Sequence, residues 1–377
     1  MKVAMVCGSY PPQACGVGDY TFRLVEELRR MHVRVDVVTT DDDQRADGPA
    51  VAVAVRGWGP VAWWRALGRL RTGGYDILHI QYPARFFGRH PGHALLTLLA
   101  RVALPQTRIV LTVHEFAIAH PLRKATIALM VLWAHRITVT TDAERRSLER
   151  WVPGVSQRMR KIPLAATVTM HAIPAGERKT LRETLAPGGE TLIGYFGFLH
   201  PNKGIGYLLA SFAHLRELRP AVRLLMLSGD TGTTHEYNTT VREEIVRRGI
   251  RESVTWTEFL PAADVSRYLQ VMDICVLPFA DGVTLRRTSF VAAMMHGLPV
   301  VTTAGADDPG EIGLRDGDNI VLVPRSDPLE GARRMTALVD DPALRSAIGT
   351  AARAWCVPLQ WDAVVRDTRE LYQSVHA

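Results

Sequence analysis

Short apolar runs alternate with segments of helical periodicity along most of this 377-residue chain. The first run, KVAMVCG, is followed by a Gly- and Pro-rich loop up to Gly18 and then by a helical pattern from about Tyr20 to Met31. Strands that alternate with helices in this way predict βαβ units and a doubly wound parallel sheet. The other apolar runs of the first half are VRVDVVTT, AVAVAV, YDILHIQ, RIVLTVHE and RITVTT.

The alternation stops at about residue 170 and starts again at TLIGYFGFL, followed by VRLLMLSG, SVTWTEFL, DICVLPF, LPVVTT and NIVLVP. A chain of this length is too long for one core. We therefore expect an α/β protein with two Rossmann-like domains, 1–170 and 191–356, joined by a linker at 171–190 and followed by a terminal helix in 357–377. A cleft between two such domains is the usual ligand site.

The composition is that of a globular protein, with 47% hydrophobic and 22% charged residues. No apolar stretch reaches the roughly 18–20 residues that span a bilayer, and Ala125–Ala134 is the longest helical candidate. The N-terminal apolar run is too short for a signal peptide. The four cysteines show no metal-ligand spacing, so we expect reduced thiols and a cytoplasmic protein.

The net charge of +7 is unevenly distributed. Residues 1–180 contain 25 Lys and Arg against 14 Asp and Glu, whereas the remainder contains 20 against 24. An Arg-rich solvated surface explains this excess of positive charge. The functional alternatives are that the first half binds an anionic acceptor or makes peripheral contact with a membrane surface. We expect no nucleic-acid partner.

Glycines at positions 16 and 18 open the first predicted helix. Without side chains, they let backbone N–H groups approach an anion at a helix N-terminus. They do not form a dinucleotide fingerprint, because the first strand ends near Cys7 and no third glycine is in register. A simple turn explains Gly16 and Gly18 equally well.

A lysine stands where the second predicted domain begins its first helix, in GFLHPNKGI. The helix dipole disfavours a cation at that end. A bound diphosphate would favour it, because a lysine there offers a point charge to phosphate. We therefore interpret Lys203 as a diphosphate ligand, and a solvated surface lysine is the alternative.

Two arginines, Arg286 and Arg287, precede an apolar helical run that ends at His296. Thr288 or Ser289 is placed to cap this helix. The helix N-terminus and two guanidinium groups together predict an anion site. We favour Arg287 over Arg286 as the residue that faces it.

The strand RIVLTVHE ends in His114 and Glu115, at the sheet edge where ligands of open α/β sheets gather. His114 is a candidate to form a hydrogen bond with a sugar hydroxyl or to act as a general acid or base. The alternative is that this histidine has only a structural role. His79 and Gln81 end another strand and are weaker candidates.

These motifs together resemble the retaining glycosyltransferases of the family-4 type, which have the GT-B fold of two facing Rossmann-like domains. The resemblance covers nearly the whole chain, and WDAVVRDTRELY is similar to the helix that crosses back onto the first domain. It is carried by YPPQACGVGDYTFRLVEEL, TVHEF, FGFLHPNKGI, VTWTEFLPAADVSRYLQVMDICVLPF, HGLPVVTT and DGDNIVLVPRSDPLEGARRMTALVDDPALRSAIGTAARA.

The resemblance implies transfer of a hexosyl-type group from a UDP- or GDP-linked sugar, with no cofactor and no metal. In that family the glycine turn lies near acceptor and donor phosphates, the residue matching His114 binds the donor sugar, and the one matching Lys203 binds the diphosphate. Phe259 and Leu260 match the segment whose backbone holds the base. Attack comes from the face that the leaving group departs from, and the donor phosphate takes the acceptor proton. We place Asp19, Tyr20, His79, Gln81 and Glu115 on the acceptor side.

The sequence departs from that family at two places. Thr284 and Ala292 stand where two glutamates are usual, and Phe198 stands where an arginine is usual. We hypothesise that Arg286 and Arg287 replace the lost arginine. The ribose contact would then fall to a neighbour of the pair; the candidates are Asp281, Thr288 and Ser289.

Three functions remain open at this stage. The first is transfer to a small polar metabolite or natural-product precursor, in a bacterial biosynthetic pathway. The second is transfer to a lipid-linked or envelope glycan at the inner face of a membrane, for which the basic first half and the WWRALGRLR segment would supply the contact. The third is a catalytically inactive nucleotide- or glycan-binding relative, which the missing glutamates would permit.

Overall fold

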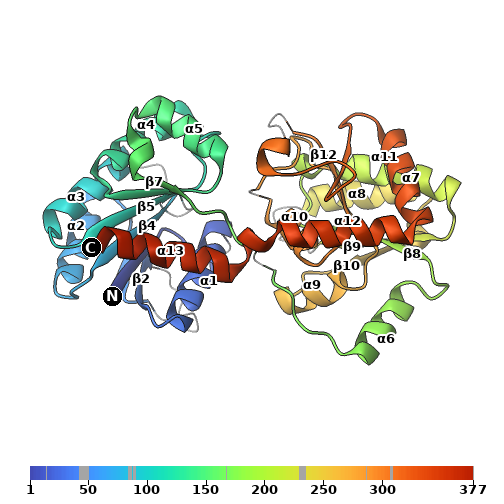
Figure 1. The fold of residues 1–377 in the computed structure, drawn as a ribbon, viewed down its shortest axis with the longest axis horizontal. Coiled ribbons are helices and arrows are strands. Elements are labelled where there is room, and N and C mark those ends of the chain that lie inside the picture. The colour runs from blue at the N-terminus through green and yellow to red at the C-terminus, as the bar shows by residue number, and fades with distance from the viewer. Residues whose placement is uncertain are drawn as a thin grey trace. The chain divides into compact units, whose positions relative to one another are not determined.

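The computed structural model describes the chain except for residues 14, 42–50, 84–86, 88–90, 167, 229–234, 286, 306–308 and 377. The chain folds into two compact units (Figure 1). The first consists of Met1–Ala165 together with Leu359–Ala377, and the second is Ala166–Pro358.

The first unit contains a seven-stranded parallel sheet in the order β3-β2-β1-β4-β5-β6-β7. The order reverses between β1 and β4, and ligands of such sheets bind outside the carboxyl ends of the strands at this switch point. The strands are β1 (Lys2–Cys7), β2 (Arg34–Thr40), β3 (Val53–Val55), β4 (Ile77–Tyr82), β5 (Arg108–Val113), β6 (Arg136–Val139) and β7 (Met159–Lys161).

Helices cover both faces of this sheet. Alternate strand residues, such as Val6 and Ile80, pack under α2, α3 and α4 on one face. The others, such as Met5 and Ile77, pack under α1 and α13 on the second face. The helices of this unit are α1 (Gly16–Arg30), α2 (Pro60–Arg71), α3 (Leu96–Ala103), α4 (Pro121–Trp133), α5 (Asp142–Trp151) and α13 (Trp361–His376).

The second unit contains a six-stranded parallel sheet in the order β10-β9-β8-β11-β12-β13, whose switch point lies between β8 and β11. Its strands are β8 (Thr191–Phe196), β9 (Val222–Leu227), β10 (Val254–Thr257), β11 (Ile274–Leu277), β12 (Val300–Thr303) and β13 (Val321–Val323). Its helices are α6 (Ala175–Leu185), α7 (Ile205–Leu218), α8 (His235–Arg247), α9 (Ala262–Leu269), α10 (Thr288–Met295), α11 (Pro328–Asp340) and α12 (Pro342–Trp355).

The two-sheet α/β architecture is the one that the sequence predicted, and every predicted strand is present. One strand and one α-helix of the described residues were not predicted. One is β7, and the other is α6, which lies inside the stretch 171–190 that we expected to be a linker. Arg182 of α6 pairs with Asp273 at 2.7 Å and donates to the carbonyl oxygen of Val271, so this helix is anchored on the second unit.

The terminal helix α13 returns to the first unit, where it packs against α1 (Figure 1). All four cysteines are free thiols, and burial raises the pKa of Cys7, Cys275 and Cys356 to about 12. Among the helices of the described residues, none combines the length and the apolar character needed to cross a membrane.

Candidate functional site

The glycine turn of the first unit lies at the start of α1, just beyond the carboxyl end of β1. Helix α1 begins at Gly16, four residues earlier than the sequence indicated, so Gly16 and Gly18 belong to its first turn. A side chain on Gly18 would put its Cβ 2.9 Å from the carbonyl oxygen of Ser9, whereas Gly16 has open space around it. Asp19 lies in the same turn, where partial desolvation raises the pKa of its carboxyl. The turn is thus open at Gly16 and closely packed at Gly18, and its first N–H groups lie at a helix N-terminus, the kind of position that favours an anion.

His114 follows β5 and is almost fully buried. Its Nε2 donates a hydrogen bond to the amide oxygen of Gln81 (2.7 Å), so Nδ1 carries the lone pair. Among the described residues no partner of Nδ1 is recorded. Burial lowers the pKa of His114 to about 4, so the ring is neutral at physiological pH. A neutral imidazole in this state accepts a hydrogen bond from a hydroxyl and is a poor general acid.

His79 has a different environment from the one that we expected. Its side chain is buried under α13, where Nδ1 lies 2.5 Å from the hydroxyl of Tyr372, and Nε2 lies 2.6 Å from the hydroxyl of Thr112. Burial lowers the pKa of His79 to about 3. Gln81 is fully buried between His79 and His114. Neither side chain has a free group for an acceptor, so the expected acceptor contacts are replaced by structural roles.

Removing the hydroxyl of Tyr372 should destabilise the first unit. In Tyr372→Phe the Nδ1 of His79 loses its hydrogen-bond partner in a buried site, which costs about 1–3 kcal/mol. Urea unfolding followed by tryptophan fluorescence measures this change. Tyr20→Phe is the control, since that ring stacks on Trp361 and no hydrogen bond of its hydroxyl is recorded in the described part of the chain. An equal stability of both variants would contradict the structural role of His79.

The other two residues that we placed on the acceptor side lie near His114 in space or sequence. The buried ring of Tyr20 meets His114 edge-on, with ring centroids 5.9 Å apart. Glu115 is exposed directly after His114. The structure thus groups Asp19, Tyr20, His114 and Glu115 at the carboxyl edge of the first sheet.

In the second unit, Lys203 lies in the loop after β8, at its switch point. The following residue, Gly204, has a φ of +68°, and a Cβ there would lie 1.8 Å from the carbonyl oxygen of Pro278. The loops after β8 and β11 are therefore in direct contact, which a hydrogen bond from Ala280 N–H to Asn202 O also fixes (3.0 Å). This contact brings Lys203 beside Phe279, with Nζ 5.3 Å from the ring centroid.

Arg287 lies against the same ring. Its guanidinium carbon is 4.8 Å from the centroid of Phe279, and it forms an ion pair with Asp281. The side chain of Arg287 is only 14% exposed, so its position is fixed by packing. Burial lowers the pKa of Lys203 to about 8, with a further decrease from Arg287 and an opposing increase from Asp281. Two cations are thus held close together by one aromatic ring and one carboxylate.

Helix α10 begins directly after Arg287. The expected cap by Thr288 or Ser289 is wrong, because Arg287 is the N-cap residue and no side-chain cap hydrogen bond is formed. The backbone N–H groups of Thr288 and Ser289 have no recorded partner among the described residues. An uncapped N-terminus next to two cations favours a bound anion. Arg286, the other arginine of the predicted pair, lies outside the described residues.

Phe259 and Leu260 lie in the loop after β10. The exposed rings of Phe259 and Phe198 stack nearly parallel, with centroids 6.5 Å apart. Phe198, for which the family resemblance implies an arginine, thus presents an exposed apolar ring. An exposed pair of aromatic rings is a flat apolar surface on which a planar group can stack.

The residue that sequence reasoning missed is Phe279. It is fully buried and contacts both cations, yet in the sequence it is only the last apolar residue of DICVLPF. A signal was present, because an aromatic residue directly after a strand and before Asp281-Gly282 is placed at the ligand edge of the sheet.

Comparisons with known proteins agree with this architecture. Residues 14–166 match the family described as Glycosyltransferase Family 4, and residues 190–341 match the family described as Glycosyl transferases group 1. Among curated relatives, the D-inositol 3-phosphate glycosyltransferase of Kineococcus radiotolerans is 26% identical over 64% of this chain and 57% of its own length. The putative glycosyltransferase YtcC of Bacillus subtilis is 22% identical over 75% of this chain and 69% of its own length. The chain thus spans little more than half the length of the first of these relatives.

Solved structures share the fold over the whole chain. Sucrose-phosphate synthase from Thermosynechococcus elongatus superposes with a TM-score of 0.76 at 19% identity, covering 99% of this chain and 98% of that one. Anabaena Alr3699/HepE in complex with UDP superposes with a TM-score of 0.78 at 17% identity, covering 99% and 100%. The chain therefore belongs to the glycosyltransferases of the family-4 type and has the GT-B fold that its motifs predicted.

Proposed function

We propose that the protein is a retaining, metal-independent glycosyltransferase that moves a hexosyl group from a UDP- or GDP-linked sugar to a small polar acceptor. The observation that carries this proposal is the cation site of the second unit, where Lys203 and Arg287 share the ring of Phe279 beside the uncapped N-terminus of α10. Such a site matches the two negative charges of a diphosphate.

The cation site would act on the leaving group. As the glycosidic bond breaks, negative charge develops on the nucleoside diphosphate, and positioned cations and N–H groups stabilise that charge most in the transition state. Arg287 and Lys203 would supply the role that a divalent ion has in metal-dependent transferases. Arg287 would also replace the arginine that the family places at Phe198.

The remaining donor contacts follow from the positions of the candidate residues. The backbone at Phe259 and Leu260 would hold the base. Thr284 and Ala292 supply no carboxylate for the ribose. The ribose would therefore be bound by Thr288, Ser289 or Asp281. Asp281 already pairs with Arg287, which favours the two hydroxyl residues. Arg286 adds a further charge to the same segment.

The first unit would supply the sugar and acceptor contacts. Neutral His114 would accept a hydrogen bond from a hydroxyl of the donor sugar through Nδ1. The N–H groups at Gly16 and Gly18 would approach the donor phosphates and the acceptor. Asp19, Tyr20 and Glu115 would contact the acceptor, whose attacking hydroxyl gives its proton to the departing phosphate oxygen.

Two of the similar proteins support the choice of substrates. Structures of Anabaena Alr3699/HepE contain UDP and UDP-glucose, which supports a UDP-linked donor. The name D-inositol 3-phosphate glycosyltransferase, carried by several relatives at 24–26% identity, describes a small polar acceptor. A phosphorylated or free polyol is therefore the acceptor class that we propose.

The affinity for the nucleotide should fall as the pH rises through about 8. The ammonium form of Lys203 is the one that attracts phosphate, and its pKa lies near 8 in the free protein. Lys203→Arg should remove this fall, because a guanidinium stays protonated up to about pH 12. Calorimetric titration with UDP at several pH values between about 7 and 9 measures it. A flat profile in the native protein would contradict a charge role for Lys203.

Product analysis tests the proposed reaction itself. The native protein, a UDP- or GDP-linked α-hexose and a panel of polyols and their phosphates should give a product whose anomeric proton reports an α linkage by NMR. A β linkage would overturn retention. Transfer to lipid-linked acceptors alone would instead support the envelope-glycan alternative.

A further inference from the structure

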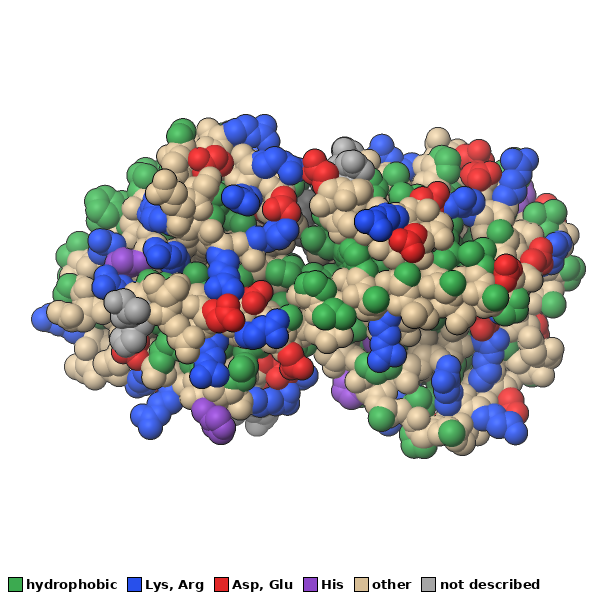
Figure 2. Space-filling model, in the orientation of Figure 1, with side chains coloured by type: hydrophobic (Ala, Val, Ile, Leu, Met, Phe, Trp, Pro, Cys, Tyr) green, Lys and Arg blue, Asp and Glu red, His purple; other side chains and the backbone are tan. Residues whose placement is uncertain are grey.

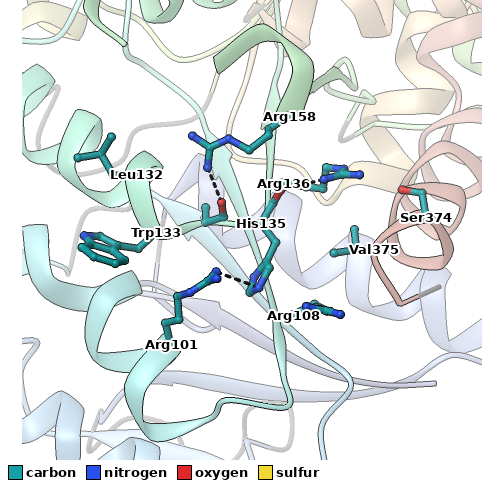
Figure 3. A pocket seen from close by; sticks show the side chains of 10 residues that line it. Arg101, Arg108, Leu132, Trp133, His135, Arg136, Arg158, Ser374 and Val375 are labelled. Atoms are coloured by element: carbon teal, nitrogen blue, oxygen red, sulfur yellow. Dashed lines mark hydrogen bonds between the residues drawn. The ribbon is translucent and has the colours of Figure 1, made fainter. Parts of the chain in front are cut away.

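A basic pocket lies in the first unit. On the face drawn in Figure 2, blue side chains gather beside the C-terminal end of α13, with a histidine among them. The pocket has a volume of about 430 Å³ and is lined by the residues drawn as sticks in Figure 3. Four of them are arginines: Arg101, Arg108, Arg136 and Arg158.

The pocket is at the amino-terminal edge of the sheet. Arg108 and Arg136 are the first residues of β5 and β6, whereas His114 follows the other end of β5. A strand of this length spans about 20 Å, so the pocket and the acceptor-side residues are at opposite edges. The pocket is therefore not part of the proposed transferase site.

The four arginines have no carboxylate partner. None of them forms an ion pair within the described residues, and no acidic side chain lines the pocket. The nearest acidic residues on α13, Asp367 and Glu370, are paired with Arg160 instead, at 3.6 and 2.7 Å. Four positive charges around one opening repel one another unless an anion joins them.

The hydrogen bonds of His135 point to a missing acceptor. Its Nδ1 accepts from the backbone N–H of Ile109 (2.9 Å), which can only donate. A neutral ring then carries its proton on Nε2, and Nε2 lies 2.9 Å from Nη1 of Arg101, which also only donates (Figure 3). Burial and the surrounding arginines lower the pKa of His135 to about 4, so the ring is neutral. Two donors thus face each other, and an anionic oxygen would satisfy both.

Stabilisation of helix ends accounts for only part of the cluster. Arg158 donates through Nη1 to the carbonyl oxygens of Val131 and Ala134 at the end of α4, as basic residues often do at helix C-termini. Arg136 donates to the carbonyl oxygen of His135. Arg101 and Arg108 make no such contact with a carbonyl oxygen among the described residues, so their N–H groups are available to a ligand.

We propose that this pocket binds a phosphate-type oxyanion, held by Arg101, Arg108 and the Nε2–H of His135. The rim contains exposed Leu132 and Trp133 from the last turn of α4. Basic residues beside an exposed tryptophan and leucine suit a phospholipid headgroup, and the arginines alone suit a free phosphate or a phosphorylated metabolite. The shared ligand chemistry is the phosphate group.

Calorimetric titration of the full-length protein with inorganic phosphate, at constant ionic strength set by chloride, tests the site. The double variant Arg101→Gln/Arg108→Gln should bind phosphate about tenfold more weakly or worse. The matched control is Arg65→Gln/Arg69→Gln, which removes the same charge from exposed positions of α2. Because Lys203 and Arg287 also attract phosphate, the titration is repeated in Arg287→Ala, where the affinity of the pocket should be unchanged.

Two further experiments show whether the phosphate group belongs to a lipid or to a free phosphate, and whether it binds beside His135. The first measures co-flotation of the protein with phosphatidylglycerol vesicles and with phosphatidylcholine vesicles. If the ligand is a lipid headgroup, binding to phosphatidylglycerol vesicles should be lost in the Arg101/Arg108 variant and kept in the control. The imidazole ¹⁵N signals of His135 should show a neutral ring protonated at Nε2, whose shift moves when phosphate is added. Absence of both phosphate and vesicle binding, an equal loss in the control, or an unmoved His135 signal would overturn the proposal.

Discussion

Replacing Arg287 by alanine should weaken the binding of a nucleoside diphosphate about 100-fold. A charge-assisted hydrogen bond contributes about 1.5–3 kcal/mol, and a guanidinium can form two of them with one diphosphate. Its position is fixed by the ring of Phe279 and by Asp281, so little side-chain entropy is lost on binding. The same variant should lower the transfer rate further, since charge on the leaving group grows in the transition state.

Arg315→Ala is the matched control for this prediction. Its side chain is 78% exposed in the same unit, and the one ion pair recorded for it is with Asp318 at 3.8 Å. Calorimetric titration with UDP and GDP compares the two variants with the native protein. If affinity is unchanged in Arg287→Ala and also when Lys203 is removed, the diphosphate does not bind at this ring.

Replacing Gly204 by alanine should destabilise the second unit by at least about 4 kcal/mol. The new Cβ would lie 1.8 Å from the carbonyl oxygen of Pro278, a backbone atom that cannot move aside without separating the loops after β8 and β11. A φ of +68° adds the strain of the left-handed region. Because these loops carry Lys203 and Phe279, nucleotide binding should fall with stability.

Gly249→Ala separates the two causes of this effect. Gly249 has a φ of +65°, but a Cβ there meets nothing within 4 Å. It should therefore cost only about 1–2 kcal/mol, from strain alone. Urea unfolding of both variants measures the difference, and equal costs would mean that the contact with Pro278 is not tight.

Most strands of both sheets are predictable because they are short, apolar on both faces and separated by helical segments. β7 was not predictable, since its three residues Met159–Lys161 are mostly charged and join the sheet only at its edge. Helix α6 was missed for a related reason. Its residues are nearly all exposed, and Leu185 is the one buried residue, so no apolar periodicity marks it.

The candidate site was predictable where strand ends determine the position of a side chain. Lys203, His114 and the glycine turn all follow strands at or beside a switch point, which a sequence alone indicates. The role of His79 was not predictable. Its partner Tyr372 is 293 residues away, and in a strand that is covered on both faces no alternation distinguishes a buried polar residue from one at the ligand edge.

The shared ring of Phe279 is also a tertiary feature. The sequence shows two separate basic positions, Lys203 and Arg287, and only the close contact at Gly204 brings them to one ring. Burial is the main cause that lowers the pKa of Lys203, and the nearby Arg287 lowers it further; the resulting value of about 8 makes a pH-dependent affinity measurable.

We propose that side chains and backbone N–H groups, without a metal ion, bind and activate a nucleotide sugar. The most direct measurement is binding and slow hydrolysis of UDP-, GDP-, ADP- and dTDP-linked sugars in the presence of EDTA. A UDP- or GDP-linked sugar should bind and be hydrolysed in EDTA. Binding that requires an added divalent cation, or no binding of any donor, would contradict it, and the second result would favour a catalytically inactive relative.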